Sequence, residues 1–370
     1  MPMMPTKGQD SGRKVLLGMS GGVDSSVAAF LLQQQGWQVC GVSLLTNNAT
    51  LSSLKDAQAL SRQLGIDWEL ADVRPEFRQL IIQDFVNAYS HGRTPNPCIL
   101  CNPLIKFATL GAIADRLGCQ AIATGHYASI RTIAGSGRLA LTKTAAGLKD
   151  QTYFLYRLDQ QQLARLIFPL AGMAKPDVRQ IADQACLSGT LGADLSQKPD
   201  SQDNCFIPDG DYSAFVSREL EKGGAAAEIA LTKPGIVVNT SGQPIGTHNG
   251  LINYTIGQRK GFSVQTTDRL FVIGRDYALN TLIVGDYLGV MRSEIKVVEP
   301  VYSGLEQIQA GEHLEARIRN SAKEVPCTVY PGINGSLRVV FDQPIAAPAP
   351  GQSCVFYRDD MIMAGGFIAD

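Results

Sequence analysis

The segment SGGVDSS, which runs from Ser20 to Ser26, limits the possible folds of this chain more than any other feature. It follows a short apolar run at 14–18, typical of a buried strand, and precedes a stretch with helical periodicity. Gly21 and Gly22 lack Cβ atoms, so backbone N–H groups there can surround an anion, and a helix start adds further donors. A strand, a glycine loop and a helix in this order predict an α/β fold with a phosphate site.

Alternating patterns extend this prediction to about residue 185. Short apolar runs alternate with amphipathic stretches, which is typical of a parallel sheet whose strands are connected by helices. We therefore expect a doubly wound parallel sheet. The predicted strands are 14–18, 38–45, 67–72 and 121–125; the predicted helices are 25–35, 51–64, 75–89 and one that ends at 117, after a loop at 91–103.

The second half of the chain has a different pattern. Beyond about Pro208, short alternating runs are separated by Gly, Pro and Asn, which indicates a mostly β structure. Breaks near 205–210 and near 290 divide the chain into three predicted domains. They are an α/β domain at 1–207, a small mostly β domain at 208–289 and a β-rich domain at 290–370.

Composition narrows the classes of partner and compartment. Lys and Arg total 33 against 34 Asp and Glu, so the net charge of -1 gives no overall attraction to a polyanion, and nucleic-acid contacts must use local basic patches. The 8 cysteines are scattered and the first residues lack an apolar segment, which favours a reduced, cytoplasmic protein. No apolar run approaches the ~18 residues of a membrane span, so we expect no membrane contact.

The glycine loop also indicates the kind of phosphate chemistry. No GKS or GKT follows the glycines, so this is not the lysine-bearing loop of kinases and GTPases. Asp24 would be repelled by bare phosphate, and we expect it to hold Mg²⁺. SGGVDSS resembles the pyrophosphatase-type loop (PP-loop) of enzymes that transfer AMP from ATP.

Three cysteines and several longer motifs extend this resemblance. HGRTPNPCILCNPLIKF carries Cys98 and Cys101 on what we expect to be an extended loop, and KPDSQDNCFI places Cys205 in a polar loop. Together with the PP-loop they resemble the bacterial tRNA-specific 2-thiouridylase (MnmA) family, over nearly the whole chain. Further motifs of that family follow in order: ATGHY at 123–127, KDQTYFLY at 149–156 and YTIGQRKG at 254–261.

The resemblance implies a PP-loop ATP-binding catalytic domain, a central tRNA-binding domain and a C-terminal β-barrel. It implies that ATP adenylates the 2-carbonyl of the wobble uridine of tRNA and that sulfur then displaces AMP to give 2-thiouridine. Cys205 would carry a persulfide, and Cys101 would be the nucleophile that releases its sulfur or closes a Cys101–Cys205 disulfide. The sulfur would come from a donor such as a cysteine desulfurase, and the enzyme would act as a monomer.

The resemblance also implies binding residues. Those expected at ATP are Gly18, Met19, Ser20, Gly21, Gly22, Val23, Asp24, Ser25, Leu44 and Gly125. Those expected at tRNA are Asn96, Pro97, Cys98, Lys149, Asp150, Gln151, Arg319 and Asn320. From its place after a strand we expect His126 near the same site. Local phosphate contacts are expected at Arg93, Lys106, Arg259 and Lys260.

Cys98 departs from the family pattern, because many members carry an acidic residue there. With Cys101 and Cys205 it makes a set of three thiols, which leads to the hypothesis of a [4Fe-4S] cluster with one open iron that carries sulfide. Zinc is a weaker alternative, since a fourth ligand is missing. The other cysteines, at 40, 119, 186, 327 and 354, lie in apolar contexts and are predicted to be core residues.

Two other functions stay open at this point. A PP-loop ligase or synthetase that adenylates a carbonyl and accepts a nitrogen nucleophile would explain SGGVDSS equally well, but it would not need Cys101 and Cys205. A non-catalytic tRNA-binding protein with a degenerate nucleotide fold is the other alternative. The intact glycines and Asp24 argue against it.

Overall fold

Five parallel strands form the sheet of the N-terminal region, in the order β3-β2-β1-β4-β7. The computed structural model describes residues 12–144, 149–185, 204–223, 229–264, 266 and 268–369. The prediction of a doubly wound parallel sheet is confirmed. The strands are β1 (Lys14–Gly18), β2 (Gln38–Leu45), β3 (Asp67–Asp72), β4 (Ala121–Ala123) and β7 (Leu166–Ile167).

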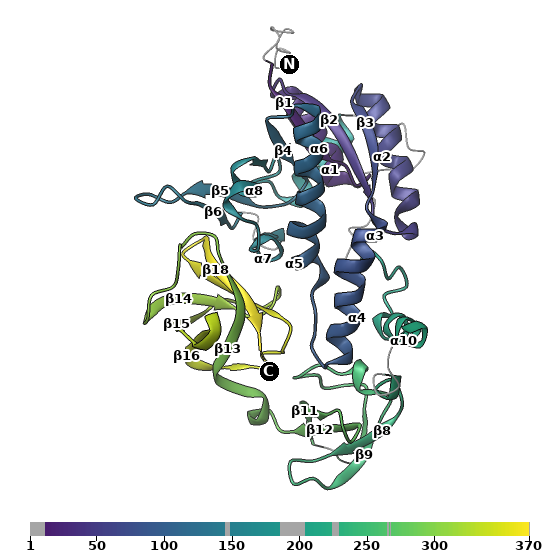
Figure 1. The fold of residues 1–370 in the computed structure, drawn as a ribbon, viewed down its shortest axis with the longest axis vertical. Coiled ribbons are helices and arrows are strands. Elements are labelled where there is room, and N and C mark those ends of the chain that lie inside the picture. The colour runs from purple at the N-terminus through teal and green to yellow at the C-terminus, as the bar shows by residue number, and fades with distance from the viewer. Residues whose placement is uncertain are drawn as a thin grey trace.

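Helices cover both faces of this sheet, because its strands are apolar on both sides (Figure 1). Along β1, Leu16 packs into one core cluster, while Val15 and Leu17 pack into another on the opposite face. Successive strand residues point to opposite faces, so one short apolar run supplies both cores. The covering helices are α1 (Val23–Gln34), α2 (Leu51–Leu64), α6 (Ala108–Leu117) and α9 (Lys175–Gln184).

The predicted loop at 91–103 is wrong in its second half, because a helix already begins at Pro97. Proline is favourable in a first helical turn, where its missing N–H is not needed. Pro103 lies inside the helix and removes a hydrogen bond there, and the helix widens to π geometry at that point. The continuous segments are α5 (Pro97–Cys101), η3 (Asn102–Phe107) and α6; before them lie α3 (Arg74–Phe77), η2 (Arg78–Ile82) and α4 (Gln83–Ser90).

The same segment, Pro97–Leu117, is by length and composition apolar enough to cross a membrane. Ile99, Phe107 and Leu110 from this segment are buried in the core against the sheet. An interior helix of a globular protein passes the same test of length and composition, so the observation is weak evidence for a membrane span.

A second sheet, in the order β10-β9-β8-β12-β11, forms a small unit at the bottom of Figure 1. Its buried residues Val237 and Val272 belong to one cluster with Phe77 and Phe85 of the helices that descend from the N-terminal region. The two regions therefore share a core. The elements are α10 (Tyr212–Gly223), β8 (Gly235–Val238), β9 (Pro244–His248), η6 (Leu251–Asn253), β10 (Ser263–Val264), β11 (Phe271–Asp276) and β12 (Thr281–Gly285).

The C-terminal strands form a closed antiparallel barrel, which confirms the third predicted architecture. β13 pairs with both β16 and β18, and this second pairing closes the sheet. A hairpin of the N-terminal region extends the barrel at β18, where Met361 pairs with Thr142. The barrel strands are β13 (Met291–Tyr302), β14 (Glu312–Arg317), β15 (Val325–Pro331), β16 (Leu337–Ala346), β17 (Ser353–Arg358) and β18 (Met361–Ile368). The remaining elements are β5 (Ser129–Thr132), β6 (Leu139–Thr142), α7 (Thr152–Leu155), α8 (Gln160–Ala164), η1 (Asn48–Thr50), η7 (Leu288–Val290) and η8 (Ile333–Gly335).

Candidate active site

The glycine loop lies between the carboxyl end of β1 and the start of α1, where two glycines permit close approach of neighbouring backbone. Gly21 has φ +73, and a Cβ atom there would lie 2.0 Å from the carbonyl oxygen of Ser53 in α2. A Cβ atom on Gly125, after β4, would lie 2.9 Å from the backbone nitrogen of Ser25. No larger residue fits either position without moving the backbone. The loop is thus pressed between α2 and the end of β4.

Hydroxyl groups hold the loop in one conformation. The backbone N–H of Ser20 donates to Ser25 Oγ at 3.2 Å, and Ser25 Oγ donates to the Gly22 carbonyl at 3.1 Å. No side chain caps the start of α1 at Gly22, so the N–H donors of its first turn are available to an anion. Met19 and Val23 are buried in the core, so their backbones rather than their side chains face the loop. Leu44, on β2, is partly buried.

Asp24 is held by two residues that the sequence did not single out. Lys175 Nζ lies 2.8 and 2.9 Å from its two carboxylate oxygens, and Tyr127 Oη donates to Oδ1 at 2.6 Å. Lys175 is the first residue of α9, which follows β7 and starts at the carboxyl edge of the sheet, where α/β folds bind ligands. A lysine at the start of an amphipathic stretch after a strand was the signal that could have identified it.

The predicted cysteines approach the same edge of the sheet from two directions. Cys98 and Cys101 lie on α5 and not on an extended loop. Cys205 is joined to the end of β2, where Asn47 Nδ2 lies 3.4 Å from its carbonyl oxygen. Phe206 is buried, with its ring centroid 5.7 Å from that of Phe77 and 5.2 Å from that of Phe85. This aromatic packing anchors the segment that carries Cys205.

All three thiols hold their protons more firmly than an ordinary cysteine. Burial, and the neighbouring thiols, raise the pKa of Cys101 to about 12, and the pKa of Cys205 rises to about 11 for the same reasons. Burial also raises the pKa of Cys98. Cys98 and Cys205 keep contact with solvent, but the protein around them still disfavours a charged thiolate. The neighbouring thiols thus contribute to the shifts in pKa at Cys101 and Cys205.

Lys106 is the cation that opposes these shifts in the pKa of each thiol. It stands five positions after Cys101, and the i to i+5 hydrogen bonding of the π turn brings these two residues to one face of the helix. Lys106 Nζ donates to Asn102 Oδ1 at 2.9 Å, and it lies 3.4 Å from His126 Nε2. Its charge therefore points back along the helix, toward Cys101.

His126 joins this group at the end of β4, as its position in the sequence predicted. Burial and the charge of Lys106 hold its pKa well below the ordinary value, so the imidazole is neutral. Nδ1 lies 2.7 Å from Thr124 Oγ1, and we assign the proton to Nδ1 because Lys106 is a donor at Nε2. The glycine loop thus follows β1, Cys205 lies beside the end of β2, and Lys106 contacts His126 at the end of β4. All three lie at the carboxyl edge of the sheet.

The residues expected at tRNA are partly exposed and partly used inside the protein. Arg319 and Asn320 are exposed on the barrel, and Asn96 is half-buried ahead of the buried Pro97. The side chain of Asp150 is only 6% exposed. Its carboxylate lies 3.2 Å from Arg317 Nη1 of the barrel, so in this arrangement it faces the protein. Lys149 and Gln151, on either side, are half-buried, and Arg259 and Lys260 are exposed.

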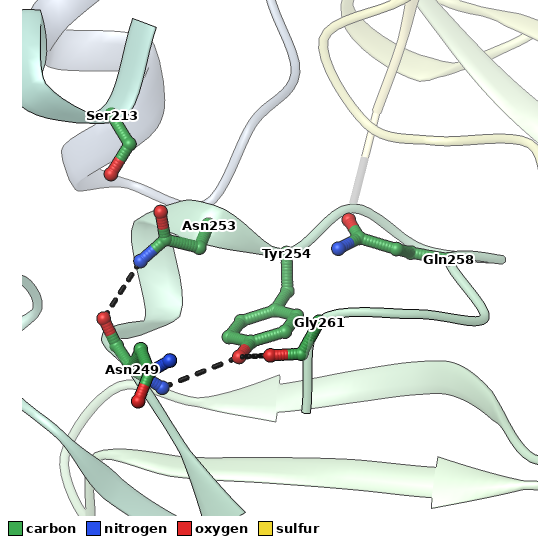
Figure 2. Close-up of a pocket in the computed structure, with 6 residues that line it drawn as sticks. All are labelled: Ser213, Asn249, Asn253, Tyr254, Gln258 and Gly261. Atoms are coloured by element: carbon green, nitrogen blue, oxygen red, sulfur yellow. Dashed lines mark hydrogen bonds between the residues drawn. The ribbon is translucent and has the colours of Figure 1, made fainter. Parts of the chain in front are cut away.

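A pocket of about 380 Å³ lies elsewhere, between α10 and the YTIGQRKG segment (Figure 2). The side chains of Asn253, Tyr254 and Gln258 already bond within the loop. Tyr254 Oη donates to the carbonyl of Gly261 at 2.6 Å, and Asn253 Nδ2 donates to the carbonyl of Asn249 at 2.8 Å. None of the sequence-predicted catalytic residues lines this pocket, and we interpret these groups as supports of the loop.

Comparisons with known proteins agree along the whole chain. Residues 13–209 match the family described as tRNA methyl transferase HUP domain, 226–286 its PRC-barrel domain, and 292–368 the aminomethyltransferase beta-barrel domain. A protein of Syntrophotalea carbinolica named tRNA-specific 2-thiouridylase MnmA is 40% identical, over 98% of this chain and 100% of the other. The protein of the same name from Acetivibrio thermocellus is 38% identical, over 97% and 99%. The chain belongs to the tRNA-specific 2-thiouridylase family.

A solved structure, a 4-thiouridine synthetase–RNA complex with bound ATP, is also similar, at 20% identity and a TM-score of 0.35 over 51% of this chain and 43% of that one. The thiouridylase family itself accounts for the order of the three sheets seen here.

As a thiouridylase, this protein offers a site that fits Mg²⁺ but not an iron–sulfur cluster. Asp24 lies in the first turn of α1 beside backbone donors for phosphate, and Lys175 bonds both of its oxygens, so Mg²⁺ here would be held mainly through water and phosphate oxygens, as Mg²⁺ commonly is. In the described part of the chain, no group of three or more His, Cys, Asp or Glu side chains is arranged to hold a metal ion.

The remaining cysteines match their predicted role. Cys40, Cys119, Cys327 and Cys354 are buried, and each cysteine that the structure describes is a free thiol. Cys186 lies outside the described residues. The interior of this thiouridylase therefore uses cysteine as a small apolar residue, away from the three thiols of the site.

Proposed function

We propose that this protein thiolates tRNA: it adenylates the 2-carbonyl of a uridine with ATP and then replaces the oxygen with sulfur. The observation that carries the proposal is the meeting of the glycine loop and the thiol group at one edge of one sheet. Phosphate chemistry and sulfur chemistry are both needed when a poor leaving oxygen is to be exchanged for sulfur. Methyl transfer, which the family description mentions, needs neither the loop nor a pair of thiols.

In the first step, the uridine oxygen attacks the α-phosphorus of ATP and pyrophosphate leaves. Backbone donors of the loop at Gly21 and Gly22, with Ser20 and Ser25, hold the phosphates, and Lys175 offers a positive charge beside Asp24. Mg²⁺ at Asp24 would add charge stabilisation on the phosphate oxygens. Such chemistry depends mainly on positioning, which the loop provides through its fixed hydroxyl hydrogen bonds.

In the second step, sulfur reaches the activated base from a persulfide on Cys205. The Cys101 thiolate attacks Cys205 Sγ, the bond to the outer sulfur breaks, and hydrosulfide leaves as a Cys101–Cys205 disulfide forms. Hydrosulfide adds to the uridine carbon and AMP leaves. A cellular thiol reductant then reopens the disulfide, and a persulfide donor such as a cysteine desulfurase reloads Cys205. Lys106, next to these thiols, favours the charged forms.

The target base must leave its stack to reach this edge, which costs least in a single-stranded loop. Exposed basic side chains at Arg259, Lys260 and Arg319 are suited to the tRNA backbone. The wobble uridine of an anticodon loop is the substrate that we propose. A monomer in the cytoplasm, where thiols stay reduced, suits this chemistry.

Mass analysis of tRNA nucleosides tests the proposal. Unmodified tRNA is incubated with the protein, ATP, Mg²⁺ and a sulfur source, and we expect 2-thiouridine at the wobble position, together with AMP and pyrophosphate. Cys205→Ser should abolish thiolation but leave tRNA-dependent pyrophosphate release. Thiolation that persists in Cys205→Ser would sink the assigned thiol route, and turnover with ammonia in place of sulfur would favour the nitrogen ligase.

A further inference from the structure

Tyr127 lies between the glycine loop and the segment 149–151. Neither of the two proposed chemical steps gives this residue a role. Its ring is 2% exposed and packs in the core cluster on the α1 side of the sheet. We propose that Tyr127 is a positioning residue, which holds Asp24 and, through Gln151, connects the nucleotide loop to the segment expected at tRNA. The inference rests on the proposed function, because it concerns how that site is held together.

The hydroxyl group of Tyr127 is hydrogen-bonded to the nucleotide loop. Its Oη donates to Asp24 Oδ1 at 2.6 Å, a short hydrogen bond of the kind made to a charged acceptor. Lys175 reaches both oxygens of the same carboxylate. Asp24 is thus held from two sides, by a cation from α9 and by a neutral donor from the end of β4. Losing either partner leaves the carboxylate free to turn away from a bound metal ion.

The backbone of Tyr127 is hydrogen-bonded to the segment expected at tRNA. Its N–H donates to Gln151 Oε1 at 2.9 Å, and the N–H of Gln151 donates to the carbonyl of Tyr127 at 3.1 Å. Two bonds between the same pair of residues fix both distance and orientation. Any displacement of Gln151 therefore moves the backbone of Tyr127, and with it the donor that holds Asp24.

The barrel is attached to the same segment, one residue earlier. Asp150 pairs with Arg317 of β14 at 3.2 Å, and Asp150 Oδ2 also accepts from Thr152 Oγ1 at 2.9 Å. Arg317 and Asp150 are mostly buried, so this connection is not a mobile surface pair. A continuous set of short contacts consequently runs from the barrel through Asp150, Gln151 and Tyr127 to Asp24. Binding of tRNA against the segment or the barrel would be felt at the nucleotide loop along this route.

Tyr127→Phe removes the hydroxyl and keeps the buried ring. We expect the variant to bind a non-hydrolysable ATP analogue with Mg²⁺ about tenfold more weakly in calorimetry without tRNA, the effect of losing a hydrogen bond to a charged group. Tyr254→Phe is the matched control, because Tyr254 Oη makes a bond of the same 2.6 Å length at Gly261, in the central region. It should bind the analogue like the parent protein.

Gln151 tests the other half of the contact. Gln151→Leu removes the acceptor for the N–H of Tyr127 and should weaken analogue binding several-fold without tRNA. This variant tests the contact independently of whether Tyr127→Phe folds. In the parent protein, unmodified tRNA should tighten analogue binding, and by linkage the analogue should tighten tRNA binding by the same factor. Tyr127→Phe should reduce this factor toward one.

Equal analogue affinity in Tyr127→Phe and the parent, or an equal loss in Tyr254→Phe, would overturn the positioning role. Failure of the parent protein to thiolate tRNA is a different result. It would overturn the proposed function, while the tRNA-free binding measurements would still decide the role of Tyr127 at Asp24.

Discussion

At the scale of single residues, the site depends on atoms that are absent as much as on those present. Gly21 and Gly125 permit backbone contacts that a methyl group would prevent, and the loop can therefore lie against α2 and β4. The cysteines depend instead on groups that are present, because the neighbouring protein groups set the pKa of each thiol. The half-buried thiol of Cys101, near two others, has a raised pKa, and Lys106 is the charge that offsets part of this shift.

Gly21→Ala should lower the free energy of unfolding by more than the strain of its backbone conformation alone explains. An L-residue at φ +73 is strained by about 1 kcal/mol, and the added methyl group would overlap the Ser53 carbonyl. We expect the free energy of unfolding to fall by roughly 2 kcal/mol or more in urea titrations, with loss of ATP-analogue binding. Gly36→Ala, at φ +80 with open space around it, is the control and should show the backbone cost only. Equal losses in the two variants would contradict the overlap.

Alkylation of Cys101 and Cys205 should need unusually alkaline conditions. Raised pKa values mean less thiolate at neutral pH, so the rate with iodoacetamide should keep rising above pH 9, the ordinary pKa, toward about 11 to 12. Lys106→Met removes the charge that lowers these pKa values, so its pH profile should move further up. Peptide mass spectrometry measures both sites. Lys260→Met, at an exposed lysine, should leave the profile in place, and a profile unmoved by Lys106→Met would refute the role of Lys106.

At the scale of elements, one helix that changes its geometry carries much of the site. Pro103 interrupts the hydrogen bonding between α5 and α6, and the π turn η3 absorbs the interruption. That widening brings Cys101 and Lys106 to one face. An aromatic group around Phe206 gives the second thiol its position, since it fixes the segment that follows Cys205 against α3 and α4.

Phe206→Ala should separate the two proposed steps. Removing the buried ring should lower the free energy of unfolding by about 3 kcal/mol and loosen the attachment of Cys205. We expect thiolation to fall strongly, while tRNA-dependent pyrophosphate release persists, because the glycine loop is untouched. Phe215→Ala, in the same aromatic group but half-buried on α10, is the comparison and should retain more thiolation at a smaller loss of stability. Parallel loss of both steps in Phe206→Ala would argue against the separation.

At the scale of the whole molecule, the barrel is joined to the N-terminal region by sheet pairing and by buried charge. The pairing of Met361 with Thr142 extends one sheet across the boundary. Arg317 lies between Asp150 of the N-terminal region and Glu324 of the barrel, at 3.2 and 2.7 Å. Buried charges of this kind add little net stability while they are paired, but they are costly when one partner is removed.

Arg317→Met should therefore destabilise the protein by about 3 kcal/mol, because it removes the cation that pairs with the buried Asp150, while Glu324 keeps its pair with Lys143 at 3.1 Å. Differential scanning calorimetry should show a lower transition temperature. Arg338→Met removes one partner of an exposed pair with Glu294 and should cost no more than about 1 kcal/mol. Equal transition temperatures for the two variants would contradict the structural importance of the buried pair.

Much of the fold followed from local patterns. Strand and helix periodicity predicted β1, β2, β3 and β4 to within a few residues, because their apolar runs stand out from the amphipathic helices between them, whereas the two-residue strand β7 was not predicted. The helix at Pro97 was missed, since two prolines and polar neighbours indicate a loop unless tertiary packing of Ile99 and Phe107 supports helical geometry. The boundaries at 207/208 and 289/290 stay predictions, as do the assigned site residues.

The sequence by itself determined the glycine loop, its strand and its helix, because these depend on backbone freedom and on residues that are neighbours in the chain. Only the tertiary structure decided which side chains hold Asp24. Tyr127 and Lys175 are 103 and 151 positions away from it, and no local pattern pairs either of them with Asp24. The same holds for the approach of Cys205 to Cys101. Contacts between distant residues arise from the packing of the whole chain, and the free energy of that packing depends on all segments together.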